Sequence, residues 1–306
     1  MYLPYLRGKQ FELLALKEIS NELEDCSNVI PIIEPVKIDD KGPIRTFIEM
    51  SNHHMKFALI LNPYNGDFKD GDFPWWKDVS PMEEFDWIPA FLIKENNACI
   101  QDIIKKIKDL SLEGVMIVVQ ESIIVEQFNE LFSMKEIKYI VYSDADSKVA
   151  KRKLKQYGKL FIRLDDNFEA KKSNSQYGDT EEKFTEEHNF YKDDGFWGLS
   201  DYTVLPKMFI DGGAVPFVLA IHLTYEKTKD EIWVRHFTSY SNSGGRENIQ
   251  GKFFEAVSKV EEFFKDKEIT EAVKKLIDYK NQGKYPGLGV IKKLSMENHI
   301  LLMNKY

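Results

Sequence analysis

Short apolar runs alternate along this chain with longer amphipathic runs, and this alternation constrains the fold more than any other feature. Each run is five to eight residues long, rich in Val, Ile and Phe, and almost uninterrupted by polar side chains. Such runs are typical of parallel strands, which are buried on both faces. The six clearest runs are Val29–Val36, Phe57–Leu61, Trp87–Ile93, Gly114–Val119, Ile137–Tyr142 and Lys159–Leu164.

The stretches between the apolar runs carry apolar residues at helical spacing. Ile100, Ile103 and Ile107 recur at intervals of three and four residues, which places them on one face of a helix. Lys105 and Lys108 fall on the opposite face. A strand, a helix and a second strand in this order predict βαβ units with right-handed crossovers.

Counting the strands narrows the choice of architecture. Two further runs, Tyr2–Leu6 and Phe196–Leu199, bring the number of predicted strands to eight. Eight strands, each followed by a helix or a loop, fit a TIM-like (β/α) barrel, which we expect over residues 1–204. An open doubly wound α/β sheet is the alternative, because the sequence does not show closure. The phosphate-binding motifs GxGxxG and GxxxxGK[ST] are absent from the chain.

The rhythm of the sequence changes after about residue 205. Phe217–Tyr225 and Glu231–Tyr240 are two strand-like runs that the segment Lys227–Asp230 joins, which predicts a β-hairpin. His222 and His236 lie on the two strands, and we interpret them as a packed pair that faces across the hairpin rather than a metal site. Helical patterns follow, so residues 205–306 are expected to form a hairpin and helical extension packed on the barrel.

One long segment carries no regular pattern. From Asp165 to Asp194 the chain is polar, and KKSNSQYGD lies at its centre. We expect an irregular loop here, and a loop of this length in a compact domain is usually functional or mobile.

The charge balance excludes some partners and leaves others open. The net charge is −8, so the surface as a whole does not attract nucleic acid or anionic membrane. A local exception is a run of five cations within ten residues that contain no acid: Lys148, Lys151, Arg152, Lys153 and Lys155. This run is either a solvated helix face or an edge that binds phosphate.

Several classes of protein are disfavoured by missing signals. Cys26 and Cys99 are too few for a disulfide framework or a Cys-based zinc site. The zinc-protease motif HExxH and the hydrolase motif GxSxG are absent, and no motif in the chain indicates a particular cofactor or metal. No apolar run approaches the roughly 18 residues of a membrane helix, and the N-terminus has no secretory signal pattern. We therefore expect a cytoplasmic protein with no membrane partner.

Polar residues follow the apolar runs and provide candidate site residues. In a barrel they would converge on the C-terminal mouth, where barrel enzymes have their active sites. Carboxylates there could act as acids, bases or oxygen ligands, and cations there could hold a phosphate or a carboxylate. The candidate catalytic residues are Glu34, Glu121, Asp144 and Asp201, and the candidate substrate-binding residues are Arg7, Lys94, Arg163 and Asn62. Alternatively, the opposite charges pair with one another and only complete the mouth.

Five segments spread over nearly the whole chain also occur as motifs in a known family. They are YLPYLRGKQFELLAL, PIIEPVK, GFWGLSDYTVLP, AIHLTYEKTKDEIWVRHF and KYPGLGVIKKLSMENHI. With these segments the chain resembles the beta-protein family, a group of bacterial and phage proteins named after a phage protein. The resemblance implies a barrel-like fold and a place in mobile elements, often beside a gene for a nuclease-like partner. The residues that match its recurrent motifs are Glu34, Asp201, His222, Arg235 and His236, and the family carries no established reaction.

Two hypotheses about function follow. The first is a cytosolic component of an anti-phage or mobile-element conflict system, which serves as an interaction platform for a partner protein or nucleic acid. The second is a barrel enzyme that acts on a phosphate-bearing or otherwise anionic small substrate at the C-terminal mouth. The first is preferred, because the appended hairpin and the local Lys clusters are accompanied by no recognised catalytic motif.

Overall fold

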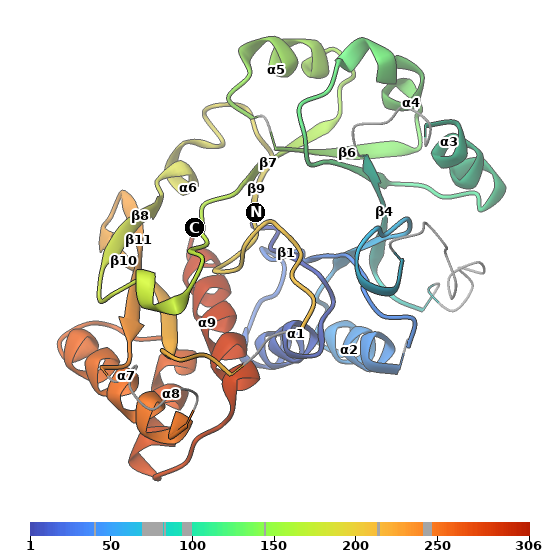
Figure 1. Cartoon of the computed structure of the whole chain (residues 1–306). Helices are drawn as coiled ribbons and strands as arrows, with labels where there is room; N and C mark the ends of the chain where they lie inside the picture. The colour runs from blue at the N-terminus through green and yellow to red at the C-terminus, as the bar shows by residue number, and fades with distance from the viewer. Residues whose placement is uncertain are drawn as a thin grey trace. The chain divides into compact units, whose positions relative to one another are not determined.

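The structure is a computed structural model that describes residues 1–39, 41–68, 82, 84–93, 100–143, 145–212, 215–240 and 247–306 (Figure 1). The chain divides into two compact units. The first, here called the barrel unit, comprises Met1–Asp166 and Glu187–Tyr202. The second, here called the hairpin unit, comprises Asn167–Glu186 and Thr203–Tyr306. None of the helices in the described ranges is long and apolar enough to cross a membrane.

The barrel unit contains an eight-stranded parallel sheet whose strands pair in chain order. The strands are β1 (Tyr5–Leu6), β2 (Ile32–Ile33), β3 (Phe57–Ile60), β4 (Trp87–Ile93), β5 (Val115–Val119), β6 (Ile137–Tyr142), β7 (Leu160–Asp165) and β9 (Gly198–Asp201). The sheet curls back on itself, since Tyr2 forms parallel bridges to both Val29 and Leu199. The amide of Leu3 also donates to the carbonyl of Leu199 at 2.8 Å. The TIM-like barrel is therefore confirmed, and the open-sheet alternative is not.

Helices cover the outside of this sheet, as Figure 1 shows. They are α1 (Gln10–Glu22), α2 (Lys41–Asn52), α3 (Ile100–Asp109), α4 (Asn129–Ser133), α5 (Lys148–Lys155) and α6 (Glu187–Phe190), with short 3-10 turns η1 (Gly66–Phe68) and η4 (Val125–Phe128). Helix α3 buries Ile100, Ile103 and Ile107, as its spacing predicts, and it exposes Lys105 and Lys108.

Residues two positions apart on the strands fill the inside of the barrel. The interior cluster includes Ile32 of β2, Ile60 of β3, Val118 of β5 and Leu164 of β7. Because side chains alternate between the two faces of a strand, this cluster fixes which later residues continue inward and which turn outward. The alternation decides where each polar residue of the mouth lies.

The hairpin unit has a three-stranded antiparallel sheet in the order β10-β11-β8. Its strands are β8 (Glu181–Thr185), β10 (Ala220–Thr228) and β11 (Glu231–Thr238), and its helices are α7 (Ile249–Phe264), α8 (Glu271–Asn281) and α9 (Leu288–Met303). Leu219, Ile221 and Leu223 form one core cluster with Val257 of α7 and Leu294 of α9. The predicted hairpin is therefore present as β10 and β11, and helices follow it in the chain.

The expectation of an irregular loop from Asp165 to Asp194 is wrong for part of this segment. It contains β8, the 3-10 turn η5 (Asn174–Gln176) and helix α6. Strand β8 reads EEKFT and pairs with β11, with Glu181 opposite Arg235. A strand at the edge of a sheet exposes much of its surface and keeps charged side chains. For this reason the sequence shows no apolar run here.

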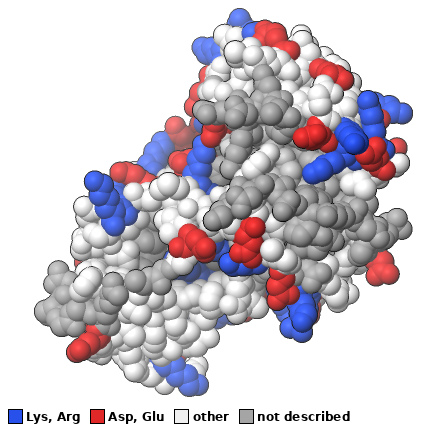
Figure 2. All heavy atoms as spheres, turned by 45° about the vertical axis from the view of Figure 1, so that its right-hand side comes forward, with Lys and Arg blue, Asp and Glu red and all other residues white. Residues whose placement is uncertain are grey.

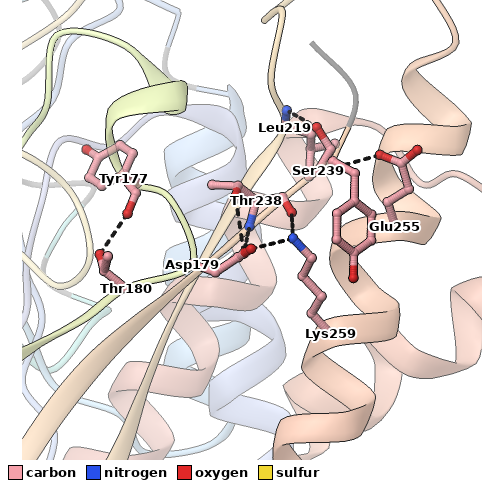
Figure 3. A network of polar contacts seen from close by, with 9 residues as sticks. Tyr177, Asp179, Thr180, Leu219, Thr238, Ser239, Glu255 and Lys259 are labelled. Atoms are coloured by element: carbon pink, nitrogen blue, oxygen red, sulfur yellow. Dashed lines mark hydrogen bonds and ion pairs between the residues drawn. The ribbon is translucent and has the colours of Figure 1, made fainter.

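A polar network ties β11 to the segment before β8 and to α7 (Figure 3). Asp179 accepts hydrogen bonds from the amide of Thr238 at 2.9 Å and from its hydroxyl at 3.1 Å. Lys259 of α7 forms an ion pair with Asp179 and donates to the carbonyl of Thr238 at 2.7 Å. The amide of Tyr240 donates to Glu255 at 2.9 Å. One carboxylate thus fixes three chain segments of the hairpin unit.

Candidate functional site

The structure describes six of the eight predicted site residues. Lys94 and Asp144 lie outside the described residues. Glu121 follows β5 and is exposed. The other five fall into two groups on opposite faces of the barrel sheet: Arg7, Glu34 and Asn62 continue the interior face, and Arg163 and Asp201 lie on the outer face.

Glu34 is the centre of the inward group. It is fully buried, with 0% of its surface exposed. The hydroxyl of Tyr5 donates to Glu34 Oε2 at 2.7 Å, and the Asn65 amide donates to Glu34 Oε1 at 2.7 Å. The backbone N–H of Tyr64 also points to Oε1, at 3.4 Å. Both oxygens of this carboxylate are therefore engaged by neighbours from the same unit.

Arg7 is buried beside the same group. Its guanidinium carbon lies 5.4 Å from the ring centroid of Tyr202 and 5.9 Å from that of Tyr5, so both aromatic rings can stabilise its charge. Gly8 has a φ of 58°, and a Cβ added there would lie 3.3 Å from the carbonyl oxygen of Glu34. This close backbone approach brings the end of β1 next to the end of β2.

Tyr202 completes the inward group and was missed by the sequence reasoning. It belongs to the interior cluster and is 1% exposed. Burial raises the pKa of its phenol, the nearby Arg7 opposes the rise, and Glu34 adds to it. The two-residue period of β9 places Tyr202 inside and its neighbour Asp201 outside, and this period was the signal that could have identified it.

The side chain of Asn62 forms hydrogen bonds with the neighbouring strand β4. Its side-chain amide donates to the carbonyl of Leu92 at 2.9 Å, and its side-chain oxygen accepts from the Leu92 amide at 2.7 Å. This pair of bonds continues the ladder between β3 and β4 beyond the last residue of β3. The side chain of Asn62 thereby stabilises the pairing of β3 and β4 at their carboxyl ends.

Arg163 is the centre of the outward group. Its Nε donates to both carboxylate oxygens of Asp165, at 2.9 and 2.8 Å, and its Nη1 donates to Asp146 at 2.9 Å. Glu187 of α6 lies 3.4 Å from the same nitrogen. Asp201 is opposite Asp165 in the pairing of β7 with β9. The hydroxyl of Tyr2 donates to Asp201 at 2.7 Å.

The surroundings of Asp165 raise the pKa of its carboxyl group towards neutral pH. Burial raises its pKa to about 6, the charges of Glu187 and Asp201 add to the rise, and Arg163 opposes it. A carboxyl that titrates near neutral pH can exchange protons, although structural ion networks produce the same perturbation. Asp165 follows Arg163 by two residues and therefore shares its outward face.

The hairpin unit holds a separate cluster around two histidines. His222 and His236 occupy opposed positions of β10 and β11, and their Nδ1 atoms lie 2.7 Å apart. The ring of Tyr177 lies 4.5 Å from the first imidazole and 4.7 Å from the second, centroid to centroid. Burial lowers the pKa of both histidines, that of His222 to about 3. The expectation that the two face each other is confirmed.

Two further observations concern ligands. Within the described ranges, no group of three or more His, Cys, Asp or Glu side chains is arranged to hold a metal ion. A depression of about 560 Å³ lies at the amino ends of β5, β6 and β7, and its lining includes Lys135, Lys138 and Lys159. These are the strand ends opposite the mouth, so the depression is not formed by the residues that follow the strands.

No protein-family model matches the chain, and no curated protein matches it significantly.

Proposed function

We propose that this chain is an interaction component and not an enzyme. In this proposal the barrel is a scaffold in a cytoplasmic anti-phage or mobile-element conflict system, and it presents its surfaces to a partner protein. The observation that carries the proposal is the burial of Glu34 together with the hydrogen bonds to both of its oxygens. Both of its oxygens accept hydrogen bonds, from Tyr5 and from Asn65, within a fully buried setting.

A general base must reach a proton on its substrate, at hydrogen-bond distance or through one water molecule. Glu34 instead meets side chains of its own unit, and the hydroxyl of Tyr2 engages Asp201, which is 1% exposed. Buried hydrogen bonds of this kind, from Tyr5 and Asn65 to Glu34 and from Tyr2 to Asp201, rigidify a core and specify its arrangement. The mouth residues are thus better suited to holding the barrel together than to contacting a substrate.

The hairpin unit offers surface for a partner. Large apolar side chains are exposed at Met208 (74%), Phe217 (56%) and Tyr240 (74%). Each of these side chains has apolar surface that a partner protein could cover. The resemblance to the beta-protein family supports a nuclease-like protein as that partner.

The test uses a variant that removes the charge of Glu34 and keeps its shape. Glu34→Gln retains an acceptor for Asn65 and a polar partner for Tyr5. We expect it to protect cells against phage as the wild type does, with the same thermal stability and the same co-purification of a co-expressed nuclease-like partner. Loss of a general base typically costs about 10²–10⁴ in rate. A collapse of protection in a variant that is folded and still binds its partner would reject the scaffold proposal.

The second candidate is a barrel enzyme for an anionic small substrate, and the position of Arg7 favours it. This guanidinium lies at the mouth beside the phenol of Tyr202, whose other neighbours include Gln120. A buried Arg binds phosphate or carboxylate well, because its planar fork can donate two parallel hydrogen bonds. Thermal stabilisation by inorganic phosphate or a sugar phosphate, lost in Arg7→Met, would support this candidate.

A further inference from the structure

Helix α5 carries three cations that form no ion pair with an acid among the described residues. Its sequence is KVAKRKLK. Lys151 lies 3.5 Å from Asp194, and Lys153 forms an ion pair with Glu126. The remaining three cations of the helix are Lys148, Arg152 and Lys155, and all three are exposed.

These three cations form one stripe. They are separated by four and then three residues, so they lie on the same face of the helix. With a rise of about 1.5 Å per residue, the stripe extends over about 10 Å. Leu154 is 1% exposed and lies on a different face, where it anchors the helix to the barrel unit.

We propose that Lys148, Arg152 and Lys155 form a contact surface for the sugar-phosphate backbone of a nucleic acid. Phosphates on one strand of duplex DNA are about 3.4 Å apart along the axis, so a stripe of about 10 Å faces three of them. No acidic residue occurs between Ser147 and Gln156 to compete for the cations. A regular row of cations without intervening acids matches the regular charge of a polyphosphate.

A membrane surface fits this helix less well. A helix that binds a bilayer inserts a broad apolar face between the lipid headgroups. Of the described aliphatic side chains of α5, Val149 is exposed, at 63%, and Leu154 is buried in the unit. The polar contact is therefore not accompanied by the apolar face that a bilayer requires.

The net negative charge of the molecule restricts the attraction for a nucleic acid to the surface of α5. The net charge is −8, and in Figure 2 basic and acidic side chains lie interspersed over the face that is seen. Binding through α5 must therefore act at short range and be sensitive to salt. The inference goes beyond the proposed function and does not depend on it, because its residues belong neither to the mouth nor to the hairpin unit.

The experiment measures fluorescence anisotropy of labelled single-stranded DNA, single-stranded RNA and duplex DNA against the full chain at a series of salt concentrations. For three phosphate contacts, log K should fall with log salt with a slope of about −2 to −3. The combined variant Lys148→Ala, Arg152→Ala and Lys155→Ala should lose at least about tenfold in affinity and most of this slope. A variant that keeps the charge, Lys148→Arg with Lys155→Arg, should bind as the wild type does.

The matched control removes the same amount of charge elsewhere on the barrel unit. Lys105→Ala, Lys108→Ala and Lys135→Ala are exposed positions outside α5, and this variant should keep the affinity of the wild type. Circular dichroism should show equal thermal stability for both triple variants. The proposal is overturned if the wild type binds none of the three nucleic acids, or if both triple variants lose affinity equally. It is equally overturned if polyglutamate or anionic vesicles compete as well as DNA.

Discussion

The Nδ1 atoms of His222 and His236 lie 2.7 Å apart across the hairpin of β10 and β11. A hydrogen bond at this distance needs one donor and one acceptor, so the two rings hold different tautomers. Nε2 of His236 lies 3.4 Å from Glu182, an acceptor, and we therefore assign a proton to this nitrogen. His222 then donates from Nδ1 to His236, and both rings are neutral.

This pair should make the hairpin unit sensitive to acid. Burial, with smaller contributions from His236 and Lys292, lowers the pKa of His222 from 6.5 to about 3. Below pH 6.5 His222 of the unfolded chain therefore binds a proton that His222 of the folded chain does not bind. The free energy of unfolding should fall as the pH falls from 6.5 towards 3, by up to about 1.4 kcal/mol per pH unit for one such group. Urea denaturation at several pH values measures this slope.

The control for the histidine pair is His222→Gln, which removes the titrating group and can still hydrogen-bond to His236. The difference in slope between wild type and variant should correspond to about one proton. Identical slopes would show that the pair does not contribute to the acid sensitivity.

The carboxyl of Asp165 should titrate near pH 6 in the folded chain, because burial raises its pKa to about 6 from the ordinary value of 3.8. Its contribution to stability is complete below 3.8 and is lost as the pH rises through about 6. Carbon-detected NMR of the side-chain carboxyl measures the midpoint. Arg163→Gln should raise the midpoint and Glu187→Gln should lower it, since the two charges act in opposite directions. Shifts of the same sign would contradict the assigned causes.

Removing the hydroxyl of Tyr5 should destabilise the barrel unit. Tyr5→Phe leaves one oxygen of the buried Glu34 without its donor, which typically costs about 1–3 kcal/mol. Tyr139→Phe is the control, because Tyr139 lies in the same interior cluster and its hydroxyl makes no hydrogen bond with the described residues. Chemical denaturation should show a smaller loss for the control, and equal losses would argue against a role for the Tyr5 hydroxyl.

Two changes at one ion pair should have unequal effects. Lys259→Met removes the ion pair with Asp179, whose side chain is 42% exposed, and one hydrogen bond to the carbonyl of Thr238, so it should cost about 1 kcal/mol. Asp179→Ala also removes the acceptor for the amide and hydroxyl of Thr238, so it should cost about 1–3 kcal/mol. Equal thermal denaturation midpoints for the two variants would contradict this ranking.

The barrel was predictable because its strands are buried on both faces and therefore appear as unbroken apolar runs. Strand β8 was not, because EEKFT at the edge of a sheet has the composition of a loop. The sequence predicted which polar residues follow the strands at the mouth, but not which of them face into the barrel. Ile32 and Glu34 share a face, whereas Arg163 is one position out of step with the inward Leu164. The two-residue period, applied to each strand, separates the inward from the outward residues.

The chain leaves the barrel unit after Asp166, supplies β8 to the sheet of the hairpin unit, and returns at Glu187. Each unit is thus interrupted in sequence by a part of the other. A recombination event that exchanged only the C-terminal hundred residues would separate β11 from its partner strand and expose an open sheet edge. The two units are consequently expected to be inherited together and to diverge as one module.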